Sequence, residues 1–239
     1  MNKLLILAVA LIIQATAFSQ TAVYLIPALH GLHKTNIRYN YDSVRAVIQR
    51  INPDVIAVEI RNEDITADSL YLKQNYPYEM WMMRYWFPNT TIEGFDWLGA
   101  ELEGQPIPNR YWLDHSRIKA LQKLLSLDTV YSKKLAACQL YNDQRMAILN
   151  NSTLKGLLQS NNAILTKAYY DCLTQYLRGS EYEELTTFYT TRHQKMMQRL
   201  QAILASHPNK RIVVLTGDDH VPYLRAFFAK QGVILKQPW

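Results

Sequence analysis

Several features are missing from the sequence, and each absence excludes a class of protein. It contains no run of lysine or arginine and no basic patch interleaved with aromatic residues, so its formal charge of +6 indicates a mildly basic surface and no nucleic-acid partner. It has no internal repeat and no low-complexity tract. It also has no H-E-x-x-H, no G-x-S-x-G and no glycine-rich phosphate loop, so no single short motif identifies an active site.

The composition is that of a globular protein. The chain has 239 residues, of which 49% are hydrophobic and 19% are charged, and this balance argues against wholesale disorder. A chain of this length builds one sizeable core and is short for two. We therefore expect a single domain over residues 20–239.

The N-terminus, MNKLLILAVALIIQATAFSQ, is typical of a secretory signal peptide over residues 1–19. One lysine precedes an apolar stretch, Leu4 to Ile13, that is too short to span a bilayer comfortably, although a retained anchor is the alternative. Ala17-Phe18-Ser19 fits a cleavage site, as does Ala15-Thr16-Ala17. No cysteine lies nearby to carry a lipid, and no later run is apolar enough for a transmembrane helix. We expect an exported protein, periplasmic or extracellular, with no stable membrane anchor.

Export gives the two cysteines, Cys138 and Cys172, two alternative interpretations. An even number of cysteines in an oxidising compartment is compatible with a disulfide, and two buried free thiols are the alternative. Neither cysteine has a histidine close in sequence, which disfavours a catalytic thiol.

Short apolar runs separated by helical patterns predict an α/β fold with a mostly parallel sheet and flanking helices. Four runs predict strands: Ala22–Pro27, Asp54–Ile60, Thr90–Trp97 and Arg211–Gly217. A fifth, Gly232–Lys236, is expected to close the sheet.

Helical spacing fills the intervals between these runs. The stretch YDSVRAVIQRI predicts a helix capped by Asp42 or Ser43, and Val221–Gly232 predicts another with Gly232 as its C-cap. From Leu113 to about Ser206 the chain is almost free of glycine and predicts three or four helices. We therefore expect a large helical insertion, at about residues 98–205, before the last strands.

Ionisable side chains follow all four predicted strands. The first strand leads to His30 and His33, the second to Glu59, Arg61 and Glu63, the third to Asp96, and the fourth to Asp218, Asp219 and His220. Three of the six histidines in the chain lie in these segments. Because functional sites of parallel α/β sheets form at the carboxyl ends of the strands, this convergence predicts a site at that edge.

The residue types at that edge suggest metal-assisted hydrolysis. His30 and His220 supply imidazole nitrogens and Glu59 an oxygen, a ligand set that with one open position lets a divalent ion acidify bound water. A spare carboxylate would act as general base and arginines would stabilise an oxyanion. The alternatives are a salt bridge from Glu59 to Arg61 or another basic residue, a neutral His220 bonded to a loop carbonyl, and an aspartate that caps the following helix.

These residues resemble motifs of the superfamily that groups the TraB/GumN proteins, the TIKI proteases, the haem-uptake ChaN proteins and the erythromycin esterases. Gly217-Asp218-Asp219-His220 resembles its second G-x-x-H motif, and PDVIAVEIRN resembles its glutamate strand. TTRHQKMMQRLQAIL is similar to its late helix, with Arg192 as the arginine and His193 in place of the usual asparagine. Pro27-Ala28-Leu29-His30 keeps the histidine of the first motif without its glycine, which leaves His33, after Gly31, as a rival.

The resemblance implies an α/β core with a helical insertion and a hydrolase site. Members are proposed to be metal-dependent hydrolases or peptidases, esterases that use a histidine base without metal, or haem binders, so the scaffold alone does not select the function. We expect an exported hydrolase of a small-molecule or peptide substrate. The metal ligands expected are His30, Glu59 and His220; the catalytic residues expected are Glu59, His220, Arg192, Arg61 and Asp219.

A non-catalytic binder of haem or another small ligand is the alternative function. It rests on the stretch YPYEMWMMRYWFPN, Tyr76 to Asn89, whose two tryptophans and three methionines would line an apolar groove. More often, such a stretch is a helix buried in the core or a contact between helices. For haem, His30 and Tyr85 are the expected contacts.

Overall fold

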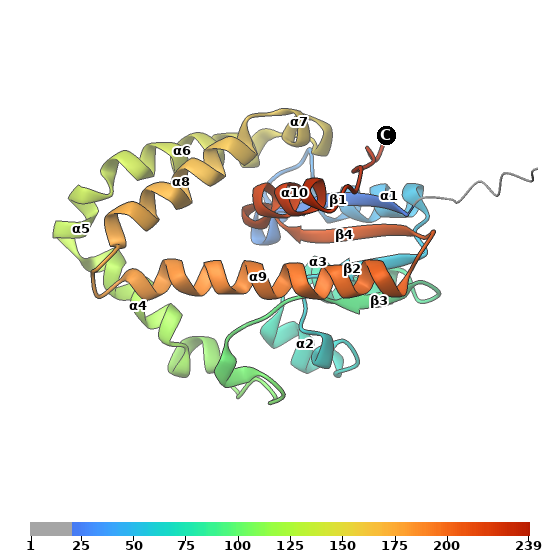
Figure 1. Ribbon diagram of the computed structural model, residues 1–239, viewed down its shortest axis with the longest axis horizontal. Coiled ribbons are helices and arrows are strands. Elements are labelled where there is room, and N and C mark those ends of the chain that lie inside the picture. Colours follow the sequence, from blue (N-terminus) through green and yellow to red (C-terminus); the bar gives the residue numbers. More distant parts are fainter. Residues whose placement is uncertain (1–20) are drawn as a thin grey trace, which may run out of the picture.

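A four-stranded, entirely parallel sheet forms the centre of the protein (Figure 1). The computed structural model describes residues 21–239, so the predicted signal peptide lies outside the described residues. The strands are β1 (Ala22–Ala28), β2 (Val55–Val58), β3 (Thr91–Gly94) and β4 (Arg211–Gly217), in the spatial order β1-β4-β2-β3. The predicted α/β class with a parallel sheet is confirmed.

Helices flank the sheet and form a large segment between β3 and β4. Their bounds are α1 (Tyr41–Ile51), α2 (Ser69–Asn75), α3 (Tyr78–Trp86), α4 (Arg117–Leu127), α5 (Thr129–Lys134), α6 (Ala136–Asn151), α7 (Leu154–Gln159), α8 (Asn162–Leu177), α9 (Glu183–Ser206) and α10 (Val221–Lys230).

Alternate residues of each strand face opposite sides of the sheet, so two separate hydrophobic clusters form. On one side Ile56 and Val58 of β2 belong to the cluster that contains α1 and α3 residues. On the other, Val55 and Ala57 belong to the cluster built from α9 and α10. Burial on both sides explains why these strands read as continuous apolar runs.

The long segment with few glycines contains six helices, α4 to α9, and not the three or four expected. Capping side chains start new helices inside it. Asp128 accepts hydrogen bonds from the backbone N–H groups of Val130 and Tyr131, and Thr153 accepts one from Gly156. Such caps compete with a continuous helix, so the chain begins new helices at these positions without a glycine in the turn.

Two predictions at element ends were wrong in detail. Helix α1 is capped by Asn40, whose Oδ1 accepts from the backbone N–H of Ser43, and not by Asp42 or Ser43. Helix α10 ends at Lys230 with Gln231 as its C-cap, so Gly232, the predicted C-cap, lies one residue further on. Gly232 has a positive φ of 68°, and its N–H donates to the carbonyl of Ala229, as in a Schellman motif.

The fifth predicted strand, Gly232–Lys236, does not form. Only an isolated parallel bridge joins Leu235 to Val23 of β1. Ile234 remains 64% exposed, so this segment gains no second buried face that would hold it in the sheet.

Helices α4 to α9 form an arm that projects from the sheet (Figure 1). Within this arm, a disulfide between Cys138 and Cys172 joins α6 to α8. Of the two alternatives for the cysteines, a disulfide or two free thiols, the structure therefore contains the disulfide. Among the described residues, no helix is both long enough and apolar enough to cross a membrane.

The disulfide is predicted to stabilise the folded chain. It closes a segment with a sequence separation of 34, and a cross-link of that span typically contributes about 2–4 kcal/mol by restricting the unfolded chain. Urea unfolding followed by circular dichroism should show a lower midpoint in reductant. A Cys138→Ala/Cys172→Ala variant serves as control, because its midpoint should not respond to reductant. An unchanged wild-type midpoint under full reduction would contradict this assignment.

Candidate active site

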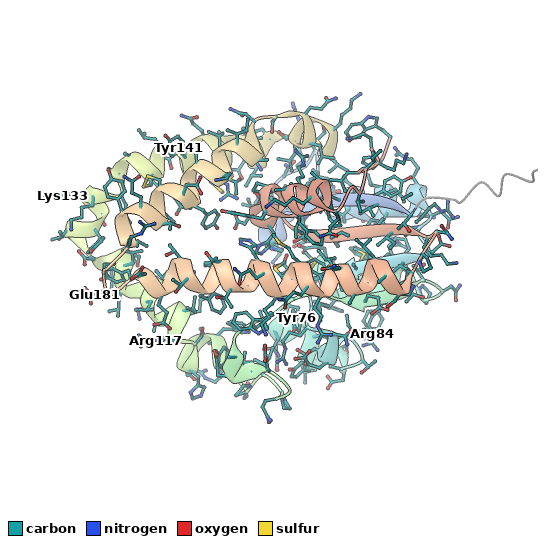
Figure 2. The ribbon with its side chains drawn as sticks, viewed as in Figure 1. Tyr76, Arg84, Arg117, Lys133, Tyr141 and Glu181 are labelled. Atoms are coloured by element: carbon teal, nitrogen blue, oxygen red, sulfur yellow. A yellow bond between two sulfur atoms is a disulfide. The ribbon has the colours of Figure 1, made fainter. Side chains whose placement is uncertain are left out.

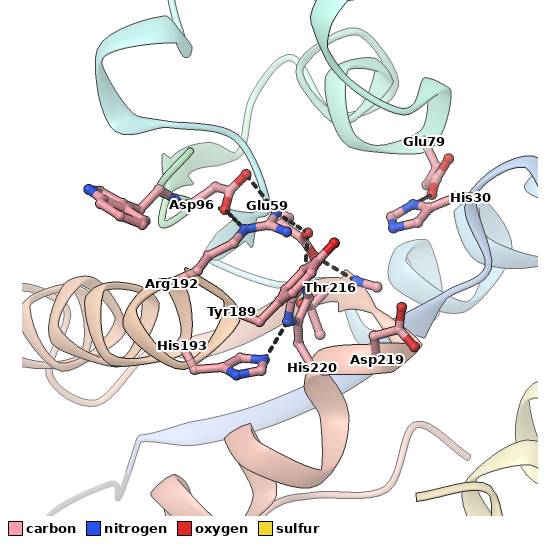
Figure 3. Close-up of polar contacts among 12 residues, drawn as sticks. His30, Glu59, Glu79, Asp96, Tyr189, Arg192, His193, Thr216, Asp219 and His220 are labelled. Carbon is pink, nitrogen blue, oxygen red and sulfur yellow. Dashed lines mark hydrogen bonds and ion pairs between the residues drawn. The ribbon is translucent and has the colours of Figure 1, made fainter. Parts of the chain in front are cut away.

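The structure brings most of the predicted site residues together at the carboxyl edge of the sheet (Figure 3). His30 follows β1, Glu59 follows β2, Asp96 follows β3 and His220 follows β4. Helix α9 passes over this edge and contributes Arg192. The parallel arrangement of the strands is what gathers segments so distant in sequence.

Glu59 is the centre of the polar network, and both of its carboxylate oxygens are fully engaged. Oε1 accepts hydrogen bonds from Arg192 Nη2 (2.7 Å) and His220 Nε2 (3.1 Å). Oε2 accepts from the Thr216 hydroxyl (2.9 Å) and the Gly217 backbone N–H (2.7 Å). The side chain is only 6% exposed.

The electrostatic surroundings of Glu59 favour its ionised form. Burial raises the pKa of the carboxyl, but the charges of His220 and Arg192 and the hydrogen bond from His220 outweigh burial and hold the pKa well below its usual range. Of the partners considered for a salt bridge with Glu59, Arg61 does not contact this carboxylate, and another basic residue, Arg192, does.

Arg192 joins Glu59 to a second buried carboxylate, Asp96. Its Nε donates to Asp96 Oδ1 at 2.8 Å and its Nη2 to Oδ2 at 3.0 Å. Burial and the charge of Glu59 raise the pKa of Asp96, while Arg192 opposes that shift. The Nη1 group of Arg192 donates no hydrogen bond to any residue between 21 and 239, and Arg192 lines a cavity.

His30 approaches the same edge from the loop after β1. Its backbone has a left-handed φ of 52°, and its Nδ1 lies 2.7 Å from Oε1 of the fully buried Glu79. Burial lowers the pKa of His30, but the hydrogen bond to Glu79 and the charges of Glu59 and Glu79 outweigh burial and raise the pKa to about 9. The ring is therefore protonated at neutral pH.

His33, the rival of His30, has a structural role. Its Nε2 accepts the Leu29 N–H at 2.8 Å, and its Nδ1 donates to the Tyr39 carbonyl at 2.6 Å. Both ring nitrogens are thus used by the backbone, and the side chain is not available at the site.

The absence of a side chain at Gly217 leaves room for the His30 ring. A Cβ atom built on Gly217 would lie 2.7 Å from His30 Nε2 and 3.5 Å from Glu59 Oε2. The imidazole therefore occupies the space directly over the end of β4, next to the central carboxylate. The backbone conformation of Gly217, with φ of −54°, is open to any residue, so steric space is what requires glycine here.

Two residues outside the predicted set, Glu79 and His193, belong to the network. Glu79 lies within the aromatic stretch that we considered as a groove, and nothing in that pattern indicated a partner for His30. His193 Nε2 is 2.8 Å from His220 Nδ1, which extends the network from Glu59 through two imidazole rings. In the sequence, the position of His193 directly after Arg192 was the one feature that indicated a place for it near the site.

Arg61 and Asp219, both predicted to be catalytic, contact other partners. Arg61 donates to Asp64 Oδ2 at 2.7 Å and to the carbonyl oxygens of Leu102 and Gln105. Asp219 forms an ion pair with Arg145 of α6.

The aspartate cap predicted for α10 is also absent. Asp218 accepts from the same Arg145 at 2.6 Å, and no side chain caps the start of α10. The two aspartates therefore tie the helical arm to the end of β4. The buried guanidinium of Arg145 recruits both carboxylates, which leaves neither for the helix N-terminus.

The donor set at this edge does not fit the predicted metal ion. Both oxygens of Glu59 are occupied by hydrogen-bond donors, one of them the cationic Arg192, and both nitrogens of His220 are paired with Glu59 and His193. Over residues 21–239, no group of three or more histidine, cysteine, aspartate or glutamate side chains is arranged to hold a metal ion.

A cavity of about 270 Å³ opens beside the network. Its lining includes His30, Glu59, Asp96 and Arg192. From the aromatic stretch only Tyr76 and Pro77 line it, while Met80 and Met83 are buried in the core.

Comparisons with known proteins identify no relative of this chain. No family model matches the chain, and no curated protein and no solved structure matches it.

Gly217→Ala is predicted to displace the His30 ring from Glu59. Because the obstructed atom is the far end of a side chain, the ring moves while the backbone stays, and the fold is retained. The matched control is Gly31→Ala, whose added Cβ meets nothing within 4 Å. NMR titration of the His30 ring checks this: its pKa should fall in Gly217→Ala and stay in Gly31→Ala. Equal titration in both variants would show that His30 does not lie over Gly217.

Proposed function

We propose that this protein is an exported hydrolase that cleaves an acyl bond, an ester or a peptide, in a small-molecule or peptide substrate. The observation that carries the proposal is the juxtaposition of His30, Glu59 and Arg192 around one cavity at the carboxyl edge of the sheet. The proposal includes membership of the superfamily that the motifs resemble.

His30 is the proton-transfer group of the proposed reaction. Glu79 fixes its Nδ1, so Nε2 is the nitrogen that remains for the substrate, and the ring carries a proton at neutral pH. Water adds to the acyl carbon, His30 Nε2–H protonates the departing oxygen or nitrogen, and the proton released by the water returns to His30. A positioned imidazole typically accelerates such a step by about 10²–10⁴-fold.

Arg192 supplies the positive charge that the tetrahedral intermediate needs. Asp96 and Glu59 hold its Nε and Nη2, which orients the guanidinium and leaves Nη1 as a donor at the cavity. A fixed donor aimed at the developing oxyanion stabilises the transition state without reorganisation. Glu59 and His220 act as positioning residues, and no step uses a metal ion.

Export is supported by the disulfide between α6 and α8. Structural disulfides persist mainly in oxidising compartments such as the periplasm or the extracellular space. The signal-peptide pattern at the N-terminus supports the same location.

Replacement of His30 is predicted to remove most of the activity. In a panel of p-nitrophenyl esters and chromogenic peptides, His30→Gln should lower kcat by about 10²–10⁴-fold, because the proton donor is lost. The kcat of the wild type should itself fall as the pH rises through about 9, where His30 loses its proton. His207→Gln is the control, since His207 pairs with Glu93 away from the cavity. Full activity of His30→Gln, or no hydrolysis of any substrate by the wild type, would refute the proposal.

A further inference from the structure

A second and larger cavity, of about 510 Å³, lies within the helical segment. Its volume falls in the range of about 300–1,000 Å³ that is usual for small-molecule sites. Helices α4, α8 and α9 provide most of its lining, and Tyr223 of α10 borders it. Tyr189 lines this cavity and the smaller one, so the two lie on either side of α9.

The helices of the arm that contains this cavity are held together at several points. Helices α8 and α9 meet at the turn around residues 178–182 and diverge toward the sheet (Figure 1). The disulfide joins α6 to α8, and the cluster of Leu121, Leu177, Tyr182 and Leu185 closes the far end. The cavity therefore lies between helices whose relative positions are fixed by these contacts.

The lining carries no formal charge. It includes five leucines and four tyrosines, with serine, threonine and glutamine, and it contains no aspartate, glutamate, lysine or arginine. Charged side chains at the far end of the arm, such as Lys133 and Glu181, point outward (Figure 2). A charged ligand would lose its hydration without an opposite charge to replace it, so the lining selects a neutral, largely apolar ligand.

One polar group at the inner end of this cavity is His193. Burial and the charges of His220 and Arg192 lower the pKa of His193 to about 3, so its ring is neutral, and it stacks on Tyr223 with 4.1 Å between ring centroids. Nε2 of His193 lies 2.8 Å from His220 Nδ1, and Nε2 of His220 lies 3.1 Å from Glu59 Oε1, so the three side chains form one hydrogen-bonded chain.

This pairing uses Nε2 of His193 and leaves Nδ1 without a hydrogen-bond partner among residues 21–239. An unpaired ring nitrogen at the cavity favours a ligand with one polar group that forms a hydrogen bond to it.

We propose that the 510 Å³ cavity is a binding site for a neutral, predominantly apolar small molecule that forms one hydrogen bond with Nδ1 of His193. Leucines and tyrosines of α8 and α9 enclose its apolar part. Through His220, the bound molecule is connected to the carboxylate of Glu59, although binding itself does not depend on hydrolysis at the smaller cavity.

N-Phenyl-1-naphthylamine tests this proposal, because it is neutral, apolar, carries one N–H group and fluoresces in apolar surroundings. Titrated into the mature chain, it should bind saturably at one site per molecule. Thr190→Trp should weaken binding at least tenfold, because Thr190 lines the cavity. Thr187→Trp is the matched control: Thr187 lies three residues away on α9 and has the same hydroxyl-to-carbonyl bonding, but it does not line the cavity.

The hydrogen bond to His193 is tested with 1-naphthol, whose hydroxyl can donate or accept, and with 1-methylnaphthalene, each measured by displacement of the fluorescent probe. The wild type should prefer 1-naphthol over 1-methylnaphthalene, and His193→Phe, which keeps a stacked ring, should bind both equally. Equal effects of the two tryptophan substitutions, or absence of saturable binding, would overturn the proposed site. Unchanged probe preference in His193→Phe would overturn the role of His193.

Discussion

The buried negative charge of Glu59 is the constraint that the rest of the site satisfies. A carboxylate that is 6% exposed is costly unless each oxygen receives donors, and here four donors from three elements converge on it. Removal of one partner from such a buried pair typically costs about 3–5 kcal/mol. Because the folded pKa lies below the unfolded one, this stabilisation is complete above the ordinary glutamate pKa and is lost as the pH falls through the folded value.

The requirement to satisfy Glu59 explains the placement of α9. This helix covers one side of the sheet with Met196, Leu200 and Ile203, and one turn earlier it delivers Arg192 to Glu59 and His193 to His220. The same helix therefore secures the core and separates the two cavities. Arg145, paired with the aspartates after β4, fixes the other side of the arm to the same sheet edge.

The sheet could be predicted from the sequence because strands that are buried on both faces consist of continuous apolar runs. The proximity of His30, Glu59 and His220 could also be predicted, since the carboxyl ends of parallel strands lie at the same edge of the sheet. The sequence was insufficient for Arg61, because a strand-end position does not determine which way a side chain turns, and Asp64 three residues later captures it. Glu79 and Arg145 were missed since both lie on helices whose approach to the sheet is set by tertiary packing.

Titration of the Glu59 carboxyl tests the central claim most directly. In protein labelled with ¹³C at glutamate carboxyls, the Glu59 resonance is assigned by its shift in Thr216→Val, which removes one hydrogen bond to Oε2. As the pH is lowered, exposed glutamates titrate near about 4.3. Glu59 should keep the carboxylate chemical shift through that range, because His220 and Arg192 hold its pKa well below the usual value. A Glu59 midpoint at or above that of the exposed glutamates would contradict an ionised, donor-saturated carboxylate at the centre of the site.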